Sequence, residues 1–250
     1  MDIQNLIDRH ALFVVNHSGG KDSQAMLLKI RQRVPDDQIL VIHATLGRVE
    51  WGGVISHILN TIDTLSFAIA ENRNKDFLGM VRNRGKWPSP QQRQCTSDLK
   101  RGPIEREIRH YLKRNPQFNG LVVNCMGLRA QESSVRAKRA PFKFNARNSK
   151  AGREWYDWLP IQDMLEEQVF QTISDYGQSP HWAYAAGMSR LSCVFCIMAS
   201  KSDLCVAAKL NPELYREYVN LEKEINHTFI MPRKGQEPIG LEEYTGIKAN

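Results

Sequence analysis

Compact apolar runs alternate with segments of helical periodicity in the first part of the chain. Each run has the length of a buried strand, and the three candidates are residues 11–15, 39–44 and 121–126. Apolar residues at helical spacing predict helices over residues 1–10, 25–30 and 54–70. Strands that alternate with helices are typical of parallel βαβ units, so the pattern predicts an α/β fold.

The pattern changes in two later places. Residues 72–100 are rich in Arg, Asn, Gln and Pro, which predicts a long functional loop. After residue 161 the chain becomes helical and cysteine-bearing, with a helix expected over 212–226 and a partly ordered tail behind it. We therefore expect a nucleotide-binding domain over 1–165 and a helical part over 166–250, packed as a single compact unit.

Length and charge narrow the class of protein. The 250 residues are 42% hydrophobic, enough for a full core, and no apolar run approaches the roughly 20 residues of a membrane span. The first residues lack the pattern of a signal peptide, so we expect a cytoplasmic protein without a membrane partner. The net charge of +7 predicts a polyanionic partner. The sequence from Arg129 to Arg153 contains eight Lys or Arg residues and one acid, Glu132.

A six-residue string follows the first predicted strand and precedes a helix. It reads Ser18-Gly19-Gly20-Lys21-Asp22-Ser23. Glycines let backbone N–H groups approach phosphate oxygens, serines add hydroxyl donors, and a lysine and a helix N-terminus add positive charge. Asp22 would repel a phosphate, so we expect it to cap the helix or help to place Mg²⁺. A capped glycine turn is the simpler alternative, but the full string after a strand favours a phosphate site.

A second block follows the strand predicted at 121–126. Its candidate nucleotide-binding residues are Gly127, Arg129, Glu132, Ser133 and Arg136. Ligands of open α/β sheets bind at the carboxyl ends of strands, and the two arginines suit bidentate contacts to phosphate. A solvated basic helix is the alternative reading of this block.

Three of the five cysteines share one short segment, Cys193-x2-Cys196-x8-Cys205. An odd number of cysteines in a cytosolic protein argues against a disulfide framework. The spacing is typical of a metal site and leaves an iron–sulfur cluster and zinc both open. Cys95, in a polar loop, is the best candidate for a fourth ligand, whereas Cys125 lies inside an apolar strand and predicts a buried, inert thiol.

The string at 18–23 resembles the PP-loop of the adenine nucleotide alpha hydrolase-like superfamily, which includes the PAPS reductases. The resemblance implies a twisted parallel sheet flanked by helices, with a cysteine-bearing helical C-terminal part. It implies that ATP with Mg²⁺ is cleaved to AMP and pyrophosphate. On the matching positions the catalytic residues would be Lys21, Asp22, Arg129 and Arg136.

Residues 93–103 and 43–51 are similar to the DNA phosphorothioation proteins of this group, DndC and SspD. That similarity implies adenylation of a DNA backbone phosphate for sulfur insertion, a host-defence modification. It also implies a cysteine desulfurase as sulfur donor, other phosphorothioation subunits as partners, and leaves a homodimer open. The implied ligands of a four-iron four-sulfur cluster are Cys95, Cys193, Cys196 and Cys205. Thr45 stands where the group usually has Asp, with Glu50 as a candidate substitute.

Three other functions remain open on the sequence. A tRNA-thiolating enzyme would use the same adenylation chemistry at a base carbonyl. A sulfonucleotide (PAPS) reductase is disfavoured, because the Glu-Cys-Gly-Ile-His motif usual in those enzymes does not occur here. A non-catalytic nucleotide-binding subunit stabilised by structural zinc would release no pyrophosphate.

Overall fold

The computed structural model describes residues 2–232 and 235–249. Two compact units interleave along the chain. Unit 1 comprises Met1–Ala44, Gly53–Ala70 and Ile104–His181, and unit 2 comprises Thr45–Gly52, Glu71–Pro103 and Trp182–Asn250. The division expected between residues 165 and 166 stays a prediction.

Unit 1 is built on a six-stranded sheet in the order β3-β2-β1-β4-β6-β5. The strands are β1 Leu12–Asn16, β2 Ile39–Ala44, β3 Ser66–Ala70, β4 Leu121–Cys125, β5 Phe142–Phe144 and β6 Glu154–Trp158. All neighbours pair in parallel except β5, which pairs antiparallel with β6 at the edge. The three predicted strands are β1, β2 and β4, and the predicted α/β class is confirmed.

The order of the strands creates a switch point between β1 and β4. From β1 the chain continues to β2 and β3 on one side, whereas β4 leads to β6 on the other. Connections that leave neighbouring strands in opposite directions open a crevice at the carboxyl ends of those strands. The loops at 17–20 and 126–129 follow these two strands and therefore lie at the crevice.

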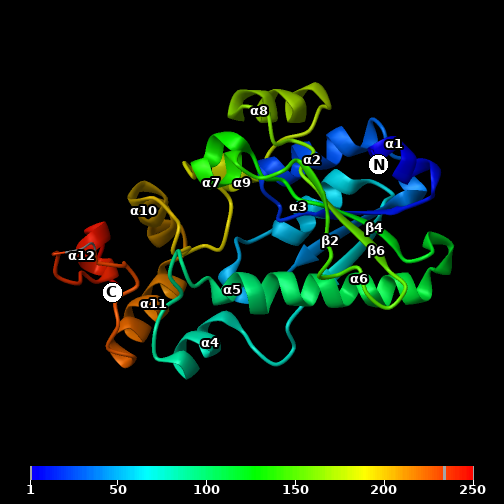
Figure 1. Ribbon diagram of the computed structural model, residues 1–250. Helices are drawn as coiled ribbons and strands as arrows, with labels where there is room; N and C mark the ends of the chain where they lie inside the picture. The colour runs from blue at the N-terminus through cyan, green and yellow to red at the C-terminus, as the bar shows by residue number, and fades with distance from the viewer. Residues whose placement is uncertain (1, 233–234, 250) are drawn as a thin grey trace. The chain divides into compact units, whose positions relative to one another are not determined.

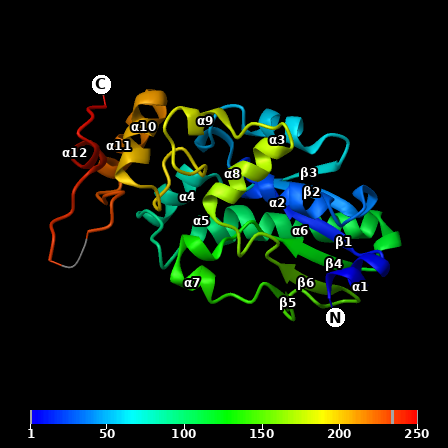
Figure 2. The ribbon, with the colours of Figure 1, turned by 90° about the horizontal axis from the view of Figure 1, so that it is seen from above.

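Helices cover both faces of the sheet in unit 1 (Figure 1 and Figure 2). The helices α2 Lys21–Arg31 and α8 Glu166–Asp175 pack together on one face, with α3 Val54–Ile62 beside α2. On the other face α6 Gly102–Arg114 contributes Ile108 and Leu112 to a core shared with Val14, Val122 and Trp155. The shorter elements are α1 Ile3–Asp8, η1 Asp36–Gln38, η4 Pro116–Phe118, η5 Ala130–Glu132 and α7 Ser134–Ala137.

Unit 2 is helical and has an aromatic core. Its elements are η2 Gly47–Val49, α4 Phe77–Arg84, α5 Gln94–Thr96, η3 Ser97–Arg101, α9 Trp182–Ala185, α10 Lys201–Leu210, α11 Pro212–Glu224 and α12 Leu241–Thr245. The ring of Tyr218 on α11 stacks with Phe77 and Trp87 at centroid distances of 6.1 and 5.1 Å. Phe195 lies 4.9 Å from the same ring and ties the cysteine-bearing segment to this core.

Two predictions of secondary structure are wrong in part. The helix expected over 54–70 ends at Ile62, because Asp63 adopts a positive φ of 55°, and Ser66–Ala70 forms the edge strand β3. The loop expected over 72–100 contains α4, which the Asp76 side chain caps and which Gly85 ends in a left-handed conformation. None of the helices in residues 2–232 and 235–249 combines the length and apolar character that a membrane span needs.

Candidate nucleotide-binding site

The loop at 17–20 joins β1 directly to α2. Gly19 has a φ of 78°, a conformation that favours glycine, and Gly20 is the N-cap of α2 without any side-chain cap bond. The first turn of α2 therefore retains backbone donors that a capping side chain would otherwise satisfy. This geometry suits an anion at the helix N-terminus.

The loop is held in shape by its own side chains. Ser23 Oγ accepts from the backbone N–H of Ser18 at 3.1 Å and donates to the Gly20 carbonyl at 2.8 Å. His17 Nδ1 accepts from the backbone N–H of Gly19 at 3.0 Å. The structure shows that Ser23 orders the loop. The phosphate contacts that the sequence predicts for Ser18 and Ser23 stay a prediction.

Lys21 and Arg129 converge on one carboxylate. Lys21 Nζ lies 3.2 Å from Asp22 Oδ2 and 3.1 Å from Glu166 Oε1, and its side chain is 3% exposed. Arg129 Nε donates to Asp22 Oδ1 at 2.6 Å, and this residue is 4% exposed. We call Lys21, Asp22, Arg129 and Glu166 the charge cluster. Asp22 thus holds two buried cations rather than capping α2.

Gly127 allows this cluster to form. A Cβ atom built on Gly127 would lie 3.1 Å from the carbonyl oxygen and 3.2 Å from the carbonyl carbon of Asp22. Both neighbours are backbone atoms, which cannot swing away as a side chain can. The close approach of the loop after β4 to the loop after β1 therefore favours a glycine at this position.

The rest of the second block has structural partners. Glu132 Oε2 accepts from the backbone N–H of Arg129 at 2.9 Å and forms an ion pair with Arg136. Ser133 caps α7 by accepting from the backbone N–H of Arg136 at 3.3 Å. Glu132 and Ser133 thus shape the turn that presents Arg129. The expected phosphate contacts of Arg136 stay a prediction.

His17, His43 and His57 of unit 1 lie near one another at the loop 17–20, which the sequence alone does not predict. Burial lowers the pKa of His17 to about 3, and the positive charge of His57 or His43 would add to this effect. His43 Nδ1 lies 2.9 Å from the backbone oxygen of His17. The His17 ring is therefore neutral at neutral pH, and with Nδ1 accepting from Gly19 it carries its proton on Nε2. Only tertiary contacts between β2, α3 and the loop bring these rings together.

Three of the four predicted metal-binding cysteines group around Lys100 in unit 2. Cys193 raises the pKa of the Lys100 ammonium most, and Cys196 and Cys95 add to the effect. Burial raises the pKa of Cys193 to about 11. Thr45 Oγ1 donates to Glu50 Oε2 at 2.9 Å, and Glu50 forms a β-bridge with Cys193. Thr45, which stands where the resembled group usually has Asp, and Glu50, its candidate substitute, therefore lie next to Cys193.

Cys205 is placed differently from the other three. It lies on α10, and its Sγ donates to the backbone oxygen of Thr245 at 3.5 Å. Within residues 2–232 and 235–249, no group of three or more His, Cys, Asp or Glu side chains is arranged to hold a metal ion. As described, these side chains do not form a four-thiolate centre. The predicted ligand set stays a prediction, and we derive no reaction step through a cluster.

Comparison with curated proteins finds two relatives of greater length. The chain is 28% identical over 182 residues to an uncharacterized 37.8 kDa protein of Escherichia phage 186, covering 67% of this chain and 53% of that protein. It is 21% identical over 220 residues to the uncharacterized protein MJ0973 of Methanocaldococcus jannaschii, covering 84% of this chain and 47% of that protein. The chain thus spans about half the length of the curated relatives it matches.

Two solved structures are similar to this chain at low sequence identity. The PAPS reductase of Candida auris in a phosphate complex aligns with a TM-score of 0.48 and 11% identity, covering 72% of this chain and 80% of that chain. The FMN adenylyltransferase of Candida glabrata, in complex with FMN and an ATP analogue, aligns with a TM-score of 0.47 and 12% identity, covering 76% and 63%.

The model of the phosphoadenosine phosphosulfate reductase domain matches residues 12–199. The match includes the loop at 17–20, the turn at 126–129 and three of the four predicted metal-binding cysteines. It extends over well more than half of the chain. This chain therefore belongs to the phosphoadenosine phosphosulfate reductase domain family, whose members are nucleotide-binding proteins with a mostly parallel sheet flanked by helices.

Proposed function

We propose that this chain binds ATP at the loop after β1, cleaves it to AMP and pyrophosphate, and so activates a DNA backbone phosphate for sulfur insertion. The charge cluster is the observation that supports the ATP site. It places two buried cations beside an uncapped helix N-terminus, at the switch point of a parallel sheet.

The residues of the cluster have distinct roles in this proposal. Arg129 and Lys21 bind the phosphates of ATP, and their burial strengthens each contact because the local dielectric is low. Asp22 accepts from both cations, so it holds them in place while no nucleotide is bound. The first-turn N–H groups of α2 add donors with no side-chain competitor. Mg²⁺, when bound, would neutralise part of the charge on the leaving pyrophosphate.

The proposed reaction proceeds in two displacements. A non-bridging oxygen of a DNA phosphate attacks the α-phosphorus of ATP, and the bond from that phosphorus to pyrophosphate breaks. A thiol reductant releases hydrosulfide from the persulfide of a cysteine desulfurase and is itself oxidised to a disulfide. The hydrosulfide then attacks the DNA phosphorus, and AMP leaves with the former DNA oxygen. Adenylation is needed because an oxygen of a phosphodiester is otherwise a poor leaving group.

The segment 129–153 supports a polyanionic substrate. Lys138, Arg139 and Lys150 are exposed, and no ion pair of theirs occurs among the residues that the structure describes. Unpaired surface cations attract phosphates and release counterions on binding, which provides affinity for nucleic acids without sequence preference. A DNA backbone phosphate is a substrate that suits both this positive charge and the proposed chemistry.

Pyrophosphate release tests the proposal directly. The intact protein is incubated with ATP and Mg²⁺, with and without DNA, and pyrophosphate and AMP are quantified. Arg129→Gln should reduce pyrophosphate release at least tenfold, because it removes a buried phosphate-binding cation. Arg33→Gln is the matched control, since Arg33 is an exposed residue just after α2. Equal activities of the two variants would refute the assigned role of the charge cluster.

A sulfonucleotide is the rival ligand that the family match favours. It would use the same helix N-terminus and the same cations, so geometry alone leaves it in competition with ATP. Thermal shifts with ATP and with 3′-phosphoadenosine 5′-phosphosulfate separate the two: the proposal expects the larger shift with ATP. Analysis of the thiolated product separates a backbone phosphorothioate from a thiolated tRNA base.

A further inference from the structure

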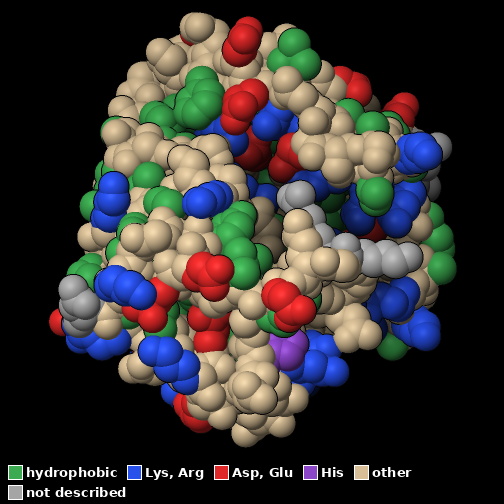
Figure 3. All heavy atoms as spheres, turned by 90° about the vertical axis from the view of Figure 1, so that its left-hand side faces the viewer, with side chains coloured by type: hydrophobic (Ala, Val, Ile, Leu, Met, Phe, Trp, Pro, Cys, Tyr) green, Lys and Arg blue, Asp and Glu red, His purple; other side chains and the backbone are tan. Residues whose placement is uncertain are grey.

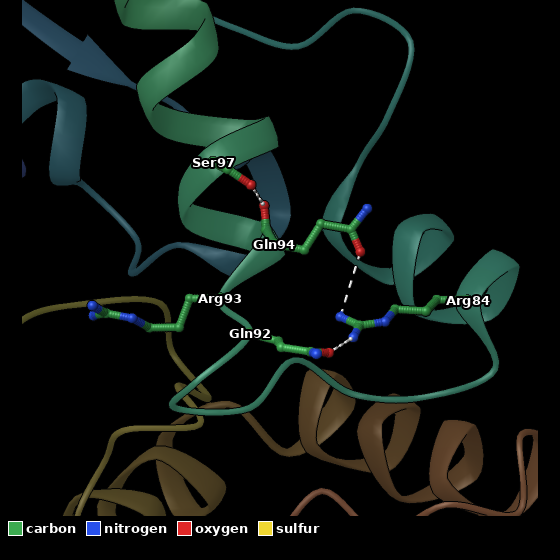
Figure 4. Close-up of a pocket in the computed structure, with 5 residues that line it drawn as sticks. All are labelled: Arg84, Gln92, Arg93, Gln94 and Ser97. Atoms are coloured by element: carbon green, nitrogen blue, oxygen red, sulfur yellow. Dashed lines mark hydrogen bonds between the residues drawn. The ribbon is translucent and has the colours of Figure 1, made fainter.

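A shallow, open polar pocket in unit 2 shares no residue with the charge cluster. Its volume is about 400 Å³, and it is lined by Arg84, Gln92, Arg93, Gln94 and Ser97. We call it the arginine cavity (Figure 4). Arg84 comes from the end of α4, Gln92 and Arg93 directly precede α5, and Gln94 and Ser97 are the first residues of α5 and η3.

The charge of Arg84 is not neutralised in this cavity. Its Nη2 donates to Gln92 Oε1 at 2.7 Å and its Nη1 to Gln94 Oε1 at 3.5 Å. Both acceptors are neutral amides, and no ion pair of Arg84 occurs within residues 2–232 and 235–249. A guanidinium that is half-buried against neutral acceptors keeps a full positive charge available to an entering anion.

The acid that contacts two lining residues, Asp98, is already engaged. Asp98 Oδ2 accepts from Gln94 Nε2 at 3.1 Å and from Lys75 Nζ at 3.3 Å, and Asp98 Oδ1 accepts from Ser97 Oγ at 2.8 Å. The surrounding sequence is strongly basic: residues 82–101 contain six Lys or Arg residues and this single acid. The cavity therefore favours an oxyanion over a cation.

Arg93 indicates what kind of oxyanion fits. It is exposed, no side-chain partner of it occurs in the described part of the chain, and it extends away from Arg84 on the opposite side of the loop (Figure 4). Two diverging guanidinium groups cannot clamp one small ion. A polynucleotide strand, in contrast, presents a phosphate at every nucleotide and can meet each arginine with a different phosphate.

The cavity borders the helical turn that carries Cys95. Gln94 and Ser97 line it, and Cys95 lies between them on the same turn of helix. On the face drawn in Figure 3, Lys and Arg side chains alternate with Asp and Glu rather than forming one broad field. A local cavity with an unneutralised arginine is therefore a more selective anchor than the general surface.

We propose that the arginine cavity holds a backbone phosphodiester of a nucleic-acid strand, with Arg84 on one phosphate and Arg93 on a neighbouring one. The assignment of the strand to DNA rests on the proposed function, whereas the oxyanion site rests on the cavity alone.

A nearly isosteric substitution tests the site. Gln92→Glu places a carboxylate where the amide oxygen now meets Arg84, so it supplies the missing counter-charge with little change in shape. Gln91→Glu is the matched control, because it adds the same charge one residue away at an exposed position that does not line the cavity. Thermal unfolding of both variants establishes that each is folded.

Binding of a fluorescein-labelled single-stranded 12-nucleotide DNA to the full chain is measured by anisotropy without ATP, so the result does not depend on nucleotide cleavage. We expect Gln92→Glu to weaken binding at least tenfold and Gln91→Glu less than threefold. The slope of log K against log salt should fall by about 0.7 for each phosphate that the variant no longer binds. Equal weakening in both variants, or none in either, would overturn the site.

A competition arm identifies the source of the oxyanion. Inorganic phosphate and AMP, each at millimolar concentration, should displace less of the DNA than an unlabelled strand of the same length at equal phosphate concentration. If AMP alone displaces the strand fully at the cavity, the ligand is a small nucleotide and the polynucleotide assignment is wrong. Absence of DNA binding by the native chain would also refute it.

Discussion

The charge cluster of unit 1 and the arginine cavity of unit 2 differ in whether a carboxylate neutralises their positive side chains. Lys21 and Arg129 are almost fully buried, and the carboxylate of Asp22 accepts from both. Arg84 is half-buried, and among the residues that the structure describes its guanidinium meets only the amide oxygens of Gln92 and Gln94. A deeply buried cation without a counter-ion strongly destabilises the fold, whereas water can solvate a partly exposed cation until an anionic ligand binds.

This difference suits the two kinds of phosphate in the proposed reaction, the triphosphate of ATP and a phosphodiester of DNA. A triphosphate carries enough charge to compete with Asp22 for two cations. A single phosphodiester carries one charge, and it binds better where no carboxylate must first be displaced. The predictions below test each half of this comparison.

The largest effect is expected when Asp22 loses its charge. Asp22→Asn leaves buried Arg129 and Lys21 without their shared carboxylate, so the free energy of unfolding should fall by about 3 kcal/mol. Urea unfolding measures the change, with exposed Asp163→Asn as control. Saturating ATP with Mg²⁺ should restore much of the loss, because phosphates would replace the missing anion. A variant as stable as the control would contradict the role given to the cluster.

Close packing at Gly127 predicts the next largest effect. Gly127→Ala would press a Cβ against the backbone of Asp22 and separate the two loops, lowering the free energy of unfolding by about 2 kcal/mol and weakening ATP binding. Gly52→Ala is the control, because a Cβ there meets no atom within 4 Å. Calorimetry gives both quantities. Unchanged ATP affinity in Gly127→Ala would show that the loops need not touch.

Acid should weaken unit 1 through His17. Its pKa is about 3 in the folded chain and near 6.5 when unfolded, so between these values the unfolded state binds the extra proton. Stability from this residue is complete above pH 6.5 and is lost as the pH falls; at pH 5 the loss amounts to about 2 kcal/mol. Urea titrations of the native chain and of His17→Gln should differ by this amount between pH 7 and 5. Parallel pH profiles would rule out a buried neutral imidazole.

The smallest effect is expected at Cys205. Its thiol makes one long hydrogen bond, to the Thr245 backbone oxygen, so Cys205→Ala should change the free energy of unfolding by less than about 1 kcal/mol. Iron, sulfide and zinc analysis after anaerobic purification accompanies this measurement, with Cys196→Ala beside it. Loss of bound metal in both variants would show that Cys205 joins the other thiols when metal binds, as the sequence predicts.

The sequence predicted the parts of the site that are local. Ser18–Ser23 and Gly127–Arg129 each follow a buried strand, and the parallel sheet brings the ends of β1 and β4 together. Contacts between distant polar residues leave no such signal. Glu166 reaches Lys21 from α8, and Gln92 meets Arg84 across a turn that the sequence presented as an irregular loop.

The strands at the edges of the sheet were also missed for physical reasons. β3 is an edge strand of Ser66–Ala70 with largely half-exposed side chains, so its apolar pattern merges with that of the preceding helix. β5 has three residues in a basic segment and pairs only with β6. Edge strands bury little apolar surface, and short patterns of this kind are ambiguous between helix and strand.

One isotope experiment tests the central claim most directly. DNA labelled with ¹⁸O at its non-bridging phosphate oxygens is incubated anaerobically with the chain, ATP, Mg²⁺, a cysteine desulfurase with cysteine, and a thiol reductant, and the AMP is analysed by mass spectrometry. Adenylation of the backbone phosphate predicts that each AMP released with phosphorothioate formation carries one ¹⁸O. Phosphorothioate formed together with unlabelled AMP, or no AMP formed at all, would contradict the account.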